Sequence, residues 1–192
     1  LETRVMKSKL PQHISIIMDG NRRFAADTGL AATLGHRAGK EKLEDVMDWV
    51  LEIGIPYLTV YALSTENITN RKPEELDALF DLYVEGLNDL AKDERILKNK
   101  VKVQVAGRKD LLPKRVLVAI ENTEKVTAEH DKFVFTVCLA YGSREEIIEA
   151  VRAIAADHAE GNIDLESIDE SEISKRLWTG DMPDPDLVIR TS

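Results

Sequence analysis

The chain has 192 residues, of which 43% are hydrophobic and 32% are charged, and its formal net charge is -9. This length and balance are typical of one globular domain with a buried core. The negative charge argues against a nucleic-acid-binding protein, because contacts with phosphate backbones need a basic face. No apolar run approaches the ~20 residues that a membrane-spanning helix needs, which predicts a soluble protein.

Short β-type segments alternate with longer helical patterns along the chain. The predicted strands are dense in Val, Ile and Leu, a composition that suits strands buried on both faces of a sheet. They cover residues 13–18, 57–63, 101–106, 133–140 and 186–190.

Helical periodicity marks the segments between these strands. In the first, an apolar stripe over 43–51 ends at Gly54, and the second opens at Pro73, a favourable first-turn residue. Further helices are predicted over 115–128, from residue 143 onward and over 170–178. Strands joined by helices imply right-handed crossovers, so we predict an α/β fold with a mainly parallel central sheet covered by helices, in one domain over 1–192.

Polar segments follow the carboxyl ends of the predicted strands, where ligands bind in a sheet of this kind. They comprise residues 19–23, 64–71 and 141–144, together with Arg190. The sequence therefore predicts one functional rim built from segments that are far apart in the chain.

The segment after the first strand, Asp-Gly-Asn-Arg-Arg at 19–23, has the chemistry of a phosphate site. Gly20 permits unusual backbone dihedral angles, and a helix that began there would point free N–H groups at an anion. Arg22 and Arg23 would add charge-assisted donors, and Asp19 is a hard oxygen ligand suited to Mg²⁺ bound to a diphosphate. A tight turn with solvated arginines is the alternative, and this segment alone does not decide between the two.

A glycine-rich segment at 35–40, Gly-His-Arg-Ala-Gly-Lys, does not match the phosphate loop of Walker-type NTPases. Only three residues separate its two glycines, and Glu41 follows Lys40 where Ser or Thr is required. His36 and Arg37 would instead face a phosphate at the start of a helix, or simply belong to the cap of that helix.

Residues 64–67, after the second strand, carry hydroxyl, carboxyl and amide groups that could position a polar ligand or relay a proton. Their composition is also that of an ordinary turn. Arg71 adds positive charge nearby, and Arg190, at the end of the last strand, could hold a second phosphate-bearing substrate beside the first loop.

Two apolar features are most simply explained by burial in the core. The stripe over 76–90, with Phe80 and Tyr83, fits a core-facing helix, although the wall of a hydrocarbon-binding cleft would show the same pattern. Cys138, the single cysteine, lies in an apolar run and is expected to be a small buried hydrophobe. One cysteine cannot form an internal disulfide, which indicates a reducing, cytoplasmic setting.

Five motifs in this order resemble the cis-prenyltransferase family, which includes undecaprenyl and dehydrodolichyl diphosphate synthases. The resemblance spans nearly the whole chain, and its first motif is highly specific. The matching segments are HISIIMDGNRRFA at 13–25, GH at 35–36, LTVYALSTEN at 58–67, AYGSREEI at 140–147 and DLVIRTS at 186–192. Arg22 and Phe24, where many bacterial members have Gly and Trp, lean toward archaeal or eukaryotic members.

The resemblance implies an enzyme that condenses isopentenyl diphosphate with an allylic prenyl diphosphate to make a long-chain polyprenyl diphosphate, a glycosyl-carrier lipid precursor. It also implies an apolar tunnel, a homodimer in the cytoplasm and peripheral contact with a membrane. The alternative within the family is a non-catalytic partner subunit that lacks the catalytic loop. The intact motif residues argue against that alternative: Asp19, Asn21, Arg23, His36 and Asn67.

The resemblance further assigns roles to individual residues. The predicted catalytic residues are Asp19, which would hold Mg²⁺, and Asn67, which would assist proton removal through a relay because an amide is a poor base. The substrates would be bound by Gly20, Asn21, Arg22, Arg23, Phe24, His36, Ser64, Thr65, Glu66, Arg71 and Arg190. The tunnel would be lined by Ala62, Leu79, Phe80 and Tyr83.

Three features depart from the family pattern. Ala32 stands where many members carry an arginine that contacts the allylic diphosphate, and Ile68 replaces an aromatic residue common beside Asn67. Members also continue past the position of Ser192 with further Arg and Ser ligands for isopentenyl diphosphate and a Glu that binds Mg²⁺ across the dimer. Because a complete domain rarely ends on a strand edge beside its active site, we expect this segment to be disordered rather than absent, and its true loss to remove most activity.

Overall fold

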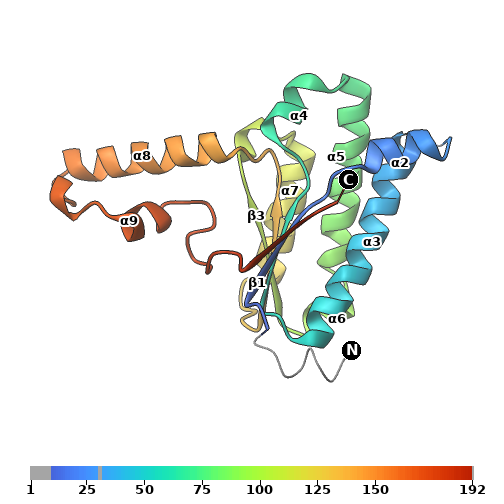
Figure 1. The fold of residues 1–192 in the computed structure, drawn as a ribbon, viewed down its shortest axis with the longest axis horizontal. Helices are drawn as coiled ribbons and strands as arrows, with labels where there is room; N and C mark the ends of the chain where they lie inside the picture. Colours follow the sequence, from blue (N-terminus) through green and yellow to red (C-terminus); the bar gives the residue numbers. More distant parts are fainter. Residues whose placement is uncertain (1–9, 30–31, 192) are drawn as a thin grey trace.

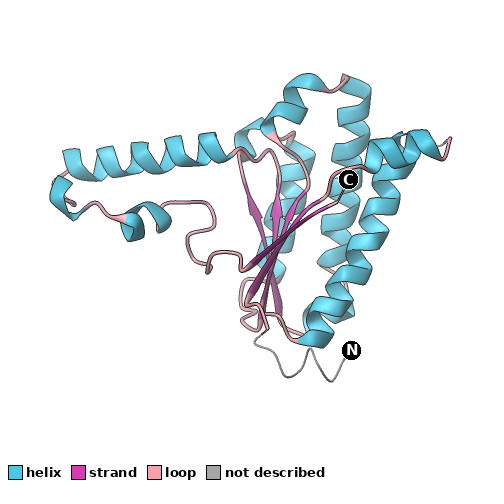
Figure 2. Cartoon of the chain, in the orientation of Figure 1, coloured by secondary structure: helices cyan, strands magenta, loops and turns pink. Residues whose placement is uncertain are grey.

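The computed structural model describes residues 10–29 and 32–191, which fold around one five-stranded sheet (Figures 1 and 2). The strands are β1 (His13–Ile17), β2 (Tyr57–Tyr61), β3 (Val101–Ala106), β4 (Phe133–Cys138) and β5 (Leu187–Arg190). The helices are α2 (Asn21–Asp27), α3 (Ala32–Ile53), α4 (Thr65–Asn70), α5 (Pro73–Leu90), α6 (Glu94–Lys98), α7 (Lys114–Val126), α8 (Ser143–Ala159) and α9 (Glu170–Ser174). All five predicted strands are present, four of them one or two residues shorter than expected.

The sheet is parallel throughout, with the order β3-β4-β2-β1-β5. Ser15 in β1 lies opposite Thr59 in β2 and opposite Val188 in β5. Since every strand runs in the same direction, the segments that follow the strands meet at the same end of the sheet. An isolated bridge between Ser64 and Tyr141 continues the pairing there. This arrangement confirms the predicted α/β architecture.

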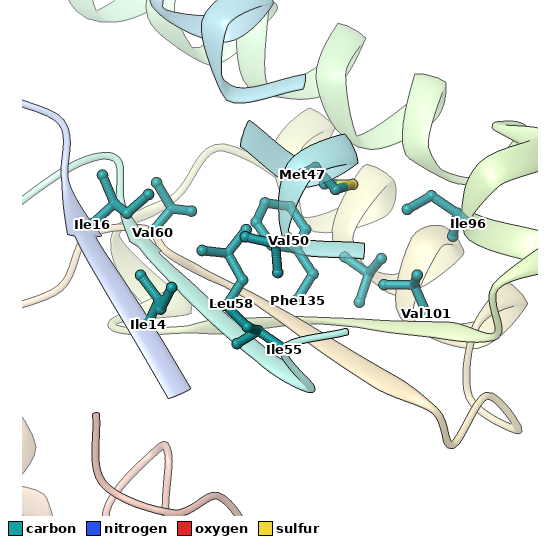
Figure 3. Packing of buried hydrophobic residues seen from close by; sticks show 11 residues of the cluster. Ile14, Ile16, Met47, Val50, Ile55, Leu58, Val60, Ile96, Val101 and Phe135 are labelled. Carbon is teal, nitrogen blue, oxygen red and sulfur yellow. The ribbon is translucent and has the colours of Figure 1, made fainter. Parts of the chain in front are cut away.

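Helices α3, α5 and α7 cover one face of the sheet. Ile16, Val60 and Phe135 point from three strands toward Met47 and Val50 of α3 (Figure 3). All of these side chains are buried, and burial of a large aliphatic or aromatic side chain contributes about 1.5–3 kcal/mol. A second cluster lies where α5 and α7 pack on the other half of the same face, around Leu87, Val105 and Ile120.

The opposite face of the sheet is polar but also buried, as Ser15, Thr59 and Thr136 show. The ring of His13 joins this face to the segment that precedes β5, with Nε2 2.8 Å from the Thr59 hydroxyl and Nδ1 2.6 Å from the carbonyl oxygen of Pro183. Helices α8 and α9 extend away from the sheet (Figure 1). The second face of the sheet is therefore crossed by the segment that precedes β5, where the Met182 sulfur lies 3.2 Å from the Thr136 hydroxyl.

Strand β5 differs from the prediction that the strands are buried on both faces. All four of its residues are exposed; β5 is one of the two edge strands of the described sheet and pairs only with β1, whereas the other edge strand, β3, is covered by α7. A carboxylate oxygen of Asp186 accepts hydrogen bonds from the backbone N–H groups of Gln12 and His13, at 2.6 and 3.1 Å. These bonds attach the start of β5 to the start of β1.

Local sequence signals explain most of the helix ends. Pro73 is the first residue of α5, and Gly54, with φ of 83°, terminates α3 as predicted. The helix predicted over 170–178 ends earlier, at Ser174, and the chain continues in turns, after which the Trp178 N–H donates to the buried carboxylate of Glu146. Three short helices were not predicted as such: α2, α4 and α6.

Two glycines allow α2 to pack closely on α3. A Cβ at Gly35 would overlap the backbone oxygen of Asn21 and lie 2.9 Å from the Ala25 Cβ, while one at Gly39 would lie 2.7 Å from the Asn21 amide nitrogen. Both glycines are inside α3, which begins at Ala32, so the segment 35–40 is neither the helix start nor its cap as the sequence suggested.

Gly35→Ala is expected to destabilise the fold by about 1–3 kcal/mol, because the added methyl group would overpack the contact between α2 and α3. Gly86→Ala is the matched control, since Gly86 is also inside a helix but its Cβ would meet only Lys40 Cε, at an ordinary 3.5 Å. There we expect a gain of up to about 1 kcal/mol from helix propensity. Urea unfolding measures both, and equal effects of the two substitutions would contradict the prediction.

Candidate active site

A cavity of about 980 Å³ opens at the rim where the parallel strands end and extends between the sheet, α3 and α5. Its mouth is polar, and its deeper part is apolar. Every predicted catalytic and substrate-binding residue except Phe24 lines the cavity: Asp19, Gly20, Asn21, Arg22, Arg23, His36, Ser64, Thr65, Glu66, Asn67, Arg71 and Arg190. Phe24 lies on α2 with half of its surface exposed, outside this lining.

The apolar part of the cavity is formed by three elements. Its lining includes Leu43 and Met47 from α3, Leu79, Leu82, Tyr83, Leu87 and Leu90 from α5, and Phe135, Val137 and Leu139 from β4 and the residue after it. Of the four predicted tunnel residues, Ala62, Leu79 and Tyr83 line it, and the Tyr83 hydroxyl donates to the Ala62 carbonyl oxygen at 3.0 Å. Phe80 is not part of the lining; it packs against the second core cluster, where the Arg115 guanidinium lies 5.9 Å from its ring.

Asp19 lies in the turn between β1 and α2. Gly20, with φ of 93°, directs the chain into α2, and its N–H donates to the Asp19 carboxylate at 2.7 Å. Arg190, at the end of β5, donates to the other carboxylate oxygen at 2.8 Å, and Arg23 lies 3.8 Å away. The Arg190 hydrogen bond and then the Gly20 N–H lower the pKa of Asp19, so this carboxylate is ionised at neutral pH.

Glu75 joins three cationic or basic side chains of the mouth. Its carboxylate accepts from Arg71 at 2.6 Å and lies 3.6 Å from Arg22 and 3.7 Å from His36. Arg71 is largely buried, and its Nε has no hydrogen-bond partner among the described residues. The basic groups at the mouth of the cavity are therefore already positioned to bind an anion, and Glu75 neutralises part of their charge.

His36 is neutral in this arrangement. Arg71 Nη1 lies 3.2 Å from His36 Nε2, and a guanidinium can only donate, so Nε2 is the accepting nitrogen and the proton is on Nδ1. Burial lowers the pKa of His36 first, and the Arg71 charge lowers it further, while Glu75 opposes both effects. Protonation of His36 would have to displace the hydrogen bond from Arg71.

The segment after β2 forms α4 at the mouth. Ser64 caps this helix, because its hydroxyl accepts from the Asn67 N–H at 3.1 Å, which confirms a turn-forming role for this serine. The Thr65 hydroxyl donates to Glu145 at 3.2 Å. Asn67 and Glu66 lie in the cavity lining on the first turns of the same helix.

Several contacts of the site were not identified from the sequence. Glu75 resembles an ordinary acidic residue in the first turn of a helix, and only its distance from the basic side chains reveals its role. Tyr141 lines the cavity, and its hydroxyl donates at 2.5 Å to the buried carboxylate of Glu146. The sequence placed Tyr141 on the rim after the predicted fourth strand, but it did not predict this contact with Glu146. Cys138 is buried, and burial raises its pKa to about 12, which agrees with a structural role.

Asp19 is suited to a magnesium ion that is shared with a ligand. Among residues 10–29 and 32–191, no three His, Cys, Asp or Glu side chains are grouped so as to hold a metal ion by themselves. Mg²⁺ commonly binds one or two carboxylates and completes its shell with water and phosphate oxygens, so a single ionised Asp beside an anion site fits this ion. The side chain of Ala32 and all of Ser192 are outside the described residues.

Glu75→Gln is expected to lower the pKa of His36 further, because it removes the anion that stabilises the imidazolium. The pKa is measured by NMR titration of the His36 ring protons. Glu74→Gln is the control, since Glu74 is an exposed neighbour on the same turn. A His36 pKa that is unchanged or higher in Glu75→Gln would contradict the arrangement described above.

Comparison with known proteins agrees with the motifs. The model of the undecaprenyl diphosphate synthase family matches residues 17–192. The tritrans,polycis-undecaprenyl-diphosphate synthase (geranylgeranyl-diphosphate specific) of Methanopyrus kandleri is 51% identical over 192 residues, which cover 100% of this chain and 70% of that protein. The enzyme of the same name from Pyrococcus horikoshii is 45% identical over 188 residues, covering 98% of this chain and 71% of that protein.

The fold also has a close counterpart among solved structures. Lavandulyl diphosphate synthase from Lavandula x intermedia, in complex with dimethylallyl diphosphate, superimposes with a TM-score of 0.89 at 33% identity. The match covers 94% of this chain and 77% of that one. The chain belongs to the undecaprenyl diphosphate synthase family and is a prenyl-transferring enzyme of the cis-prenyltransferase type.

Proposed function

We propose that this enzyme elongates geranylgeranyl diphosphate with isopentenyl diphosphate, through cis condensations, to undecaprenyl diphosphate. The observation that carries the proposal is one cavity in which a basic mouth continues into an apolar interior. Such a cavity suits a molecule with an anionic head and a hydrocarbon tail. The primer and the product are those named for the archaeal relatives, and they replace the unspecified long-chain product expected from the sequence.

The basic residues of the mouth would bind the diphosphate of the allylic primer. Arg71 and His36 are held in place by Glu75 and by each other, so little side-chain entropy is lost when the anion arrives. Arg22 and Arg23 are largely exposed and would close on the phosphate oxygens from α2. Electrostatic stabilisation of this kind is strongest for the charge that develops on the leaving diphosphate.

Asp19 would hold Mg²⁺ together with the diphosphate. Bound there, the ion supplies Lewis-acid stabilisation of the charge that develops on the leaving oxygen. Because Arg190 and Gly20 keep the carboxylate ionised, Asp19 does not have to lose a proton before it binds a cation. Arg190 would then turn from Asp19 toward the diphosphate of isopentenyl diphosphate.

In the condensation, the double bond of isopentenyl diphosphate attacks the allylic carbon, the carbon–oxygen bond to diphosphate breaks, and a proton is lost to form the new cis double bond. Asn67 would orient the group that accepts this proton, since an amide is itself a poor base. Ser64 fixes Asn67 by capping α4, and Thr65 and Glu66 stand beside it in the lining.

The apolar interior would shelter the growing chain from water. Transfer of hydrocarbon surface from water into such a lining stabilises it by roughly 25 cal/mol per Å². The buried Leu79 and Leu87 provide fixed parts of that lining. Each condensation that pushes the tail deeper is therefore favoured by burial of the new unit.

We further propose that the enzyme works as a homodimer. Ile147, Ile148 and Val151 lie on α8 with about half of their surface exposed, and the apolar residues Val188 and Ile189 of edge strand β5 are also exposed. Apolar patches and open strand edges of this kind usually mark an interaction surface. Among the described residues no helix is long and apolar enough to cross a membrane, and contact with a membrane surface stays a prediction.

Asp19→Asn is expected to reduce kcat by about 100-fold or more, because it removes the anionic ligand for the cation that stabilises the leaving group. Incorporation of radiolabelled isopentenyl diphosphate into geranylgeranyl diphosphate, with Mg²⁺, measures the effect. Asp27→Asn is the control, since Asp27 is an exposed residue at the other end of α2. Near-normal turnover by Asp19→Asn would refute the role of Asp19, and no incorporation by the wild type with any allylic primer would refute the proposed function.

Ile148→Asp combined with Val151→Asp is expected to convert a dimer into a monomer, because it places charges in the apolar face of α8. Sedimentation velocity measures the molar mass, and Arg152→Asp, at an exposed neighbouring position, is the control. A wild type that sediments as a monomer would overturn the homodimer.

A further inference from the structure

The side wall of the cavity between α3 and α5 contains a notch that is covered by one side chain. Gly86 of α5 lines the cavity and has no side chain of its own, and the position that its Cβ would occupy lies 3.5 Å from Lys40 Cε. Lys40 comes from α3, lines the same cavity and has 21% of its side chain exposed. The aliphatic stem of Lys40 therefore covers the gap that Gly86 leaves.

Ion pairs to α5 hold Lys40 over this gap. Its ammonium group donates to Asp89 at 2.7 Å and to Glu85 at 3.3 Å, and Arg37, one turn earlier on α3, donates to Glu85 at 3.0 Å. Burial lowers the pKa of Lys40, but the hydrogen bonds from Lys40 to Asp89 and Glu85 outweigh this effect and raise it overall. Lys40 therefore stays charged, and its stem keeps one orientation.

The ion pairs continue along the wall toward α6. Arg95 pairs with Asp48 at 2.8 Å and lies 3.9 Å from Glu44, both on α3. Glu44 and Arg95 also line the cavity, together with Asp89 and Asp93 and beside apolar residues such as Leu43, Met47 and Leu90. Charged groups tolerate contact with a hydrocarbon cavity only where they remain paired or hydrated, and Glu44, Asp89 and Arg95 are each between 40 and 58% exposed. The charged side chains between α3 and α5 therefore contact both the cavity and the solvent.

We propose that Lys40, lying over Gly86 and paired with Glu85 and Asp89, is a specificity-determining residue that limits the length of the prenyl product. This inference deepens the proposed function and rests on it. A hydrocarbon tail that reaches the notch meets the stem of Lys40 and cannot displace it without separating the ion pairs. Removal of the stem opens the side wall and gives the tail additional room, whereas a larger residue at position 86 takes room away.

The test compares the length distributions of products formed by the wild type and by variants from geranylgeranyl diphosphate and radiolabelled isopentenyl diphosphate. Lys40→Ala is expected to lengthen the main product by about one isoprene unit, because the lost stem has roughly the volume of one unit. Lys40→Met keeps an unbranched side chain over the gap at Gly86 but removes the ion pairs. It should therefore lengthen the product less than Lys40→Ala does. Gly86→Leu should shorten the product.

Lys42→Ala is the matched control. Lys42 is also on α3, but it pairs with Asp45 at 2.6 Å, lies 6.0 Å from the ring of Trp49 and is not part of the cavity lining. The Lys42→Ala variant should give the same distribution of product lengths as the wild type. Normal incorporation with unchanged product lengths in Lys40→Ala, Lys40→Met and Gly86→Leu would overturn this inference alone. No incorporation by the wild type would overturn the proposed function and, with it, this inference.

Discussion

The parallel pairing of β1 with β2 on one side and with β5 on the other brings the parts of the active site together. Asp19 follows β1, Ser64 follows β2, and Arg190 ends β5, and parallel strands place all three at the same edge of the sheet. An antiparallel arrangement of any one strand would move its residue to the opposite edge, more than a strand length away. The site thus depends first on backbone hydrogen bonds and only then on its own side chains.

The net charge of the molecule does not reveal how its charged groups are distributed. The chain is acidic overall, at -9, yet the cavity mouth concentrates basic groups within a few ångströms of Glu75. A local basic cluster in an acidic protein attracts a small polyanion without giving the surface as a whole an affinity for nucleic acid. Glu75 reduces the repulsion between these basic side chains when no anion is bound. Its carboxylate also lowers the energetic cost of burying the Arg71 guanidinium.

Much of the fold could be predicted from the sequence, because strand composition and helix periodicity are local signals. Five dense apolar runs correspond to the five strands, and Pro73 and Gly54 mark helix ends for reasons that act within a few residues. It was harder to predict which of two adjacent residues on one helix lines the cavity. Leu79 lines the cavity and Phe80 does not, although both belong to one apolar stripe, since the two are about 100° apart around the helix and α7 packs on one side only.

The site was predictable where a motif follows a strand, and not where residues meet across helices. The rim residues from 19 to 23 and from 64 to 67 were found by position alone, whereas Glu75 and the pairing of Lys40 with Asp89 depend on how α3 lies against α5. The failed match of 35–40 to a phosphate loop has a physical cause in the structure. Gly35 and Gly39 are required for the contact between two helices and do not wrap around a phosphate.

The attachment of β5 has a consequence for the order of events during protein synthesis. Asp186 bonds to the N–H groups of Gln12 and His13, more than 170 positions earlier, and Arg190 reaches Asp19 from a similar distance along the chain. Contacts between residues so far apart in the sequence form late, and here they cannot form until Asp186 and Arg190 have emerged from the ribosome. A nascent chain can therefore pair β1 to β4 before Arg190 has emerged, and a chain that stalls before residue 190 would have this central part of the sheet but not the arginine partner of Asp19.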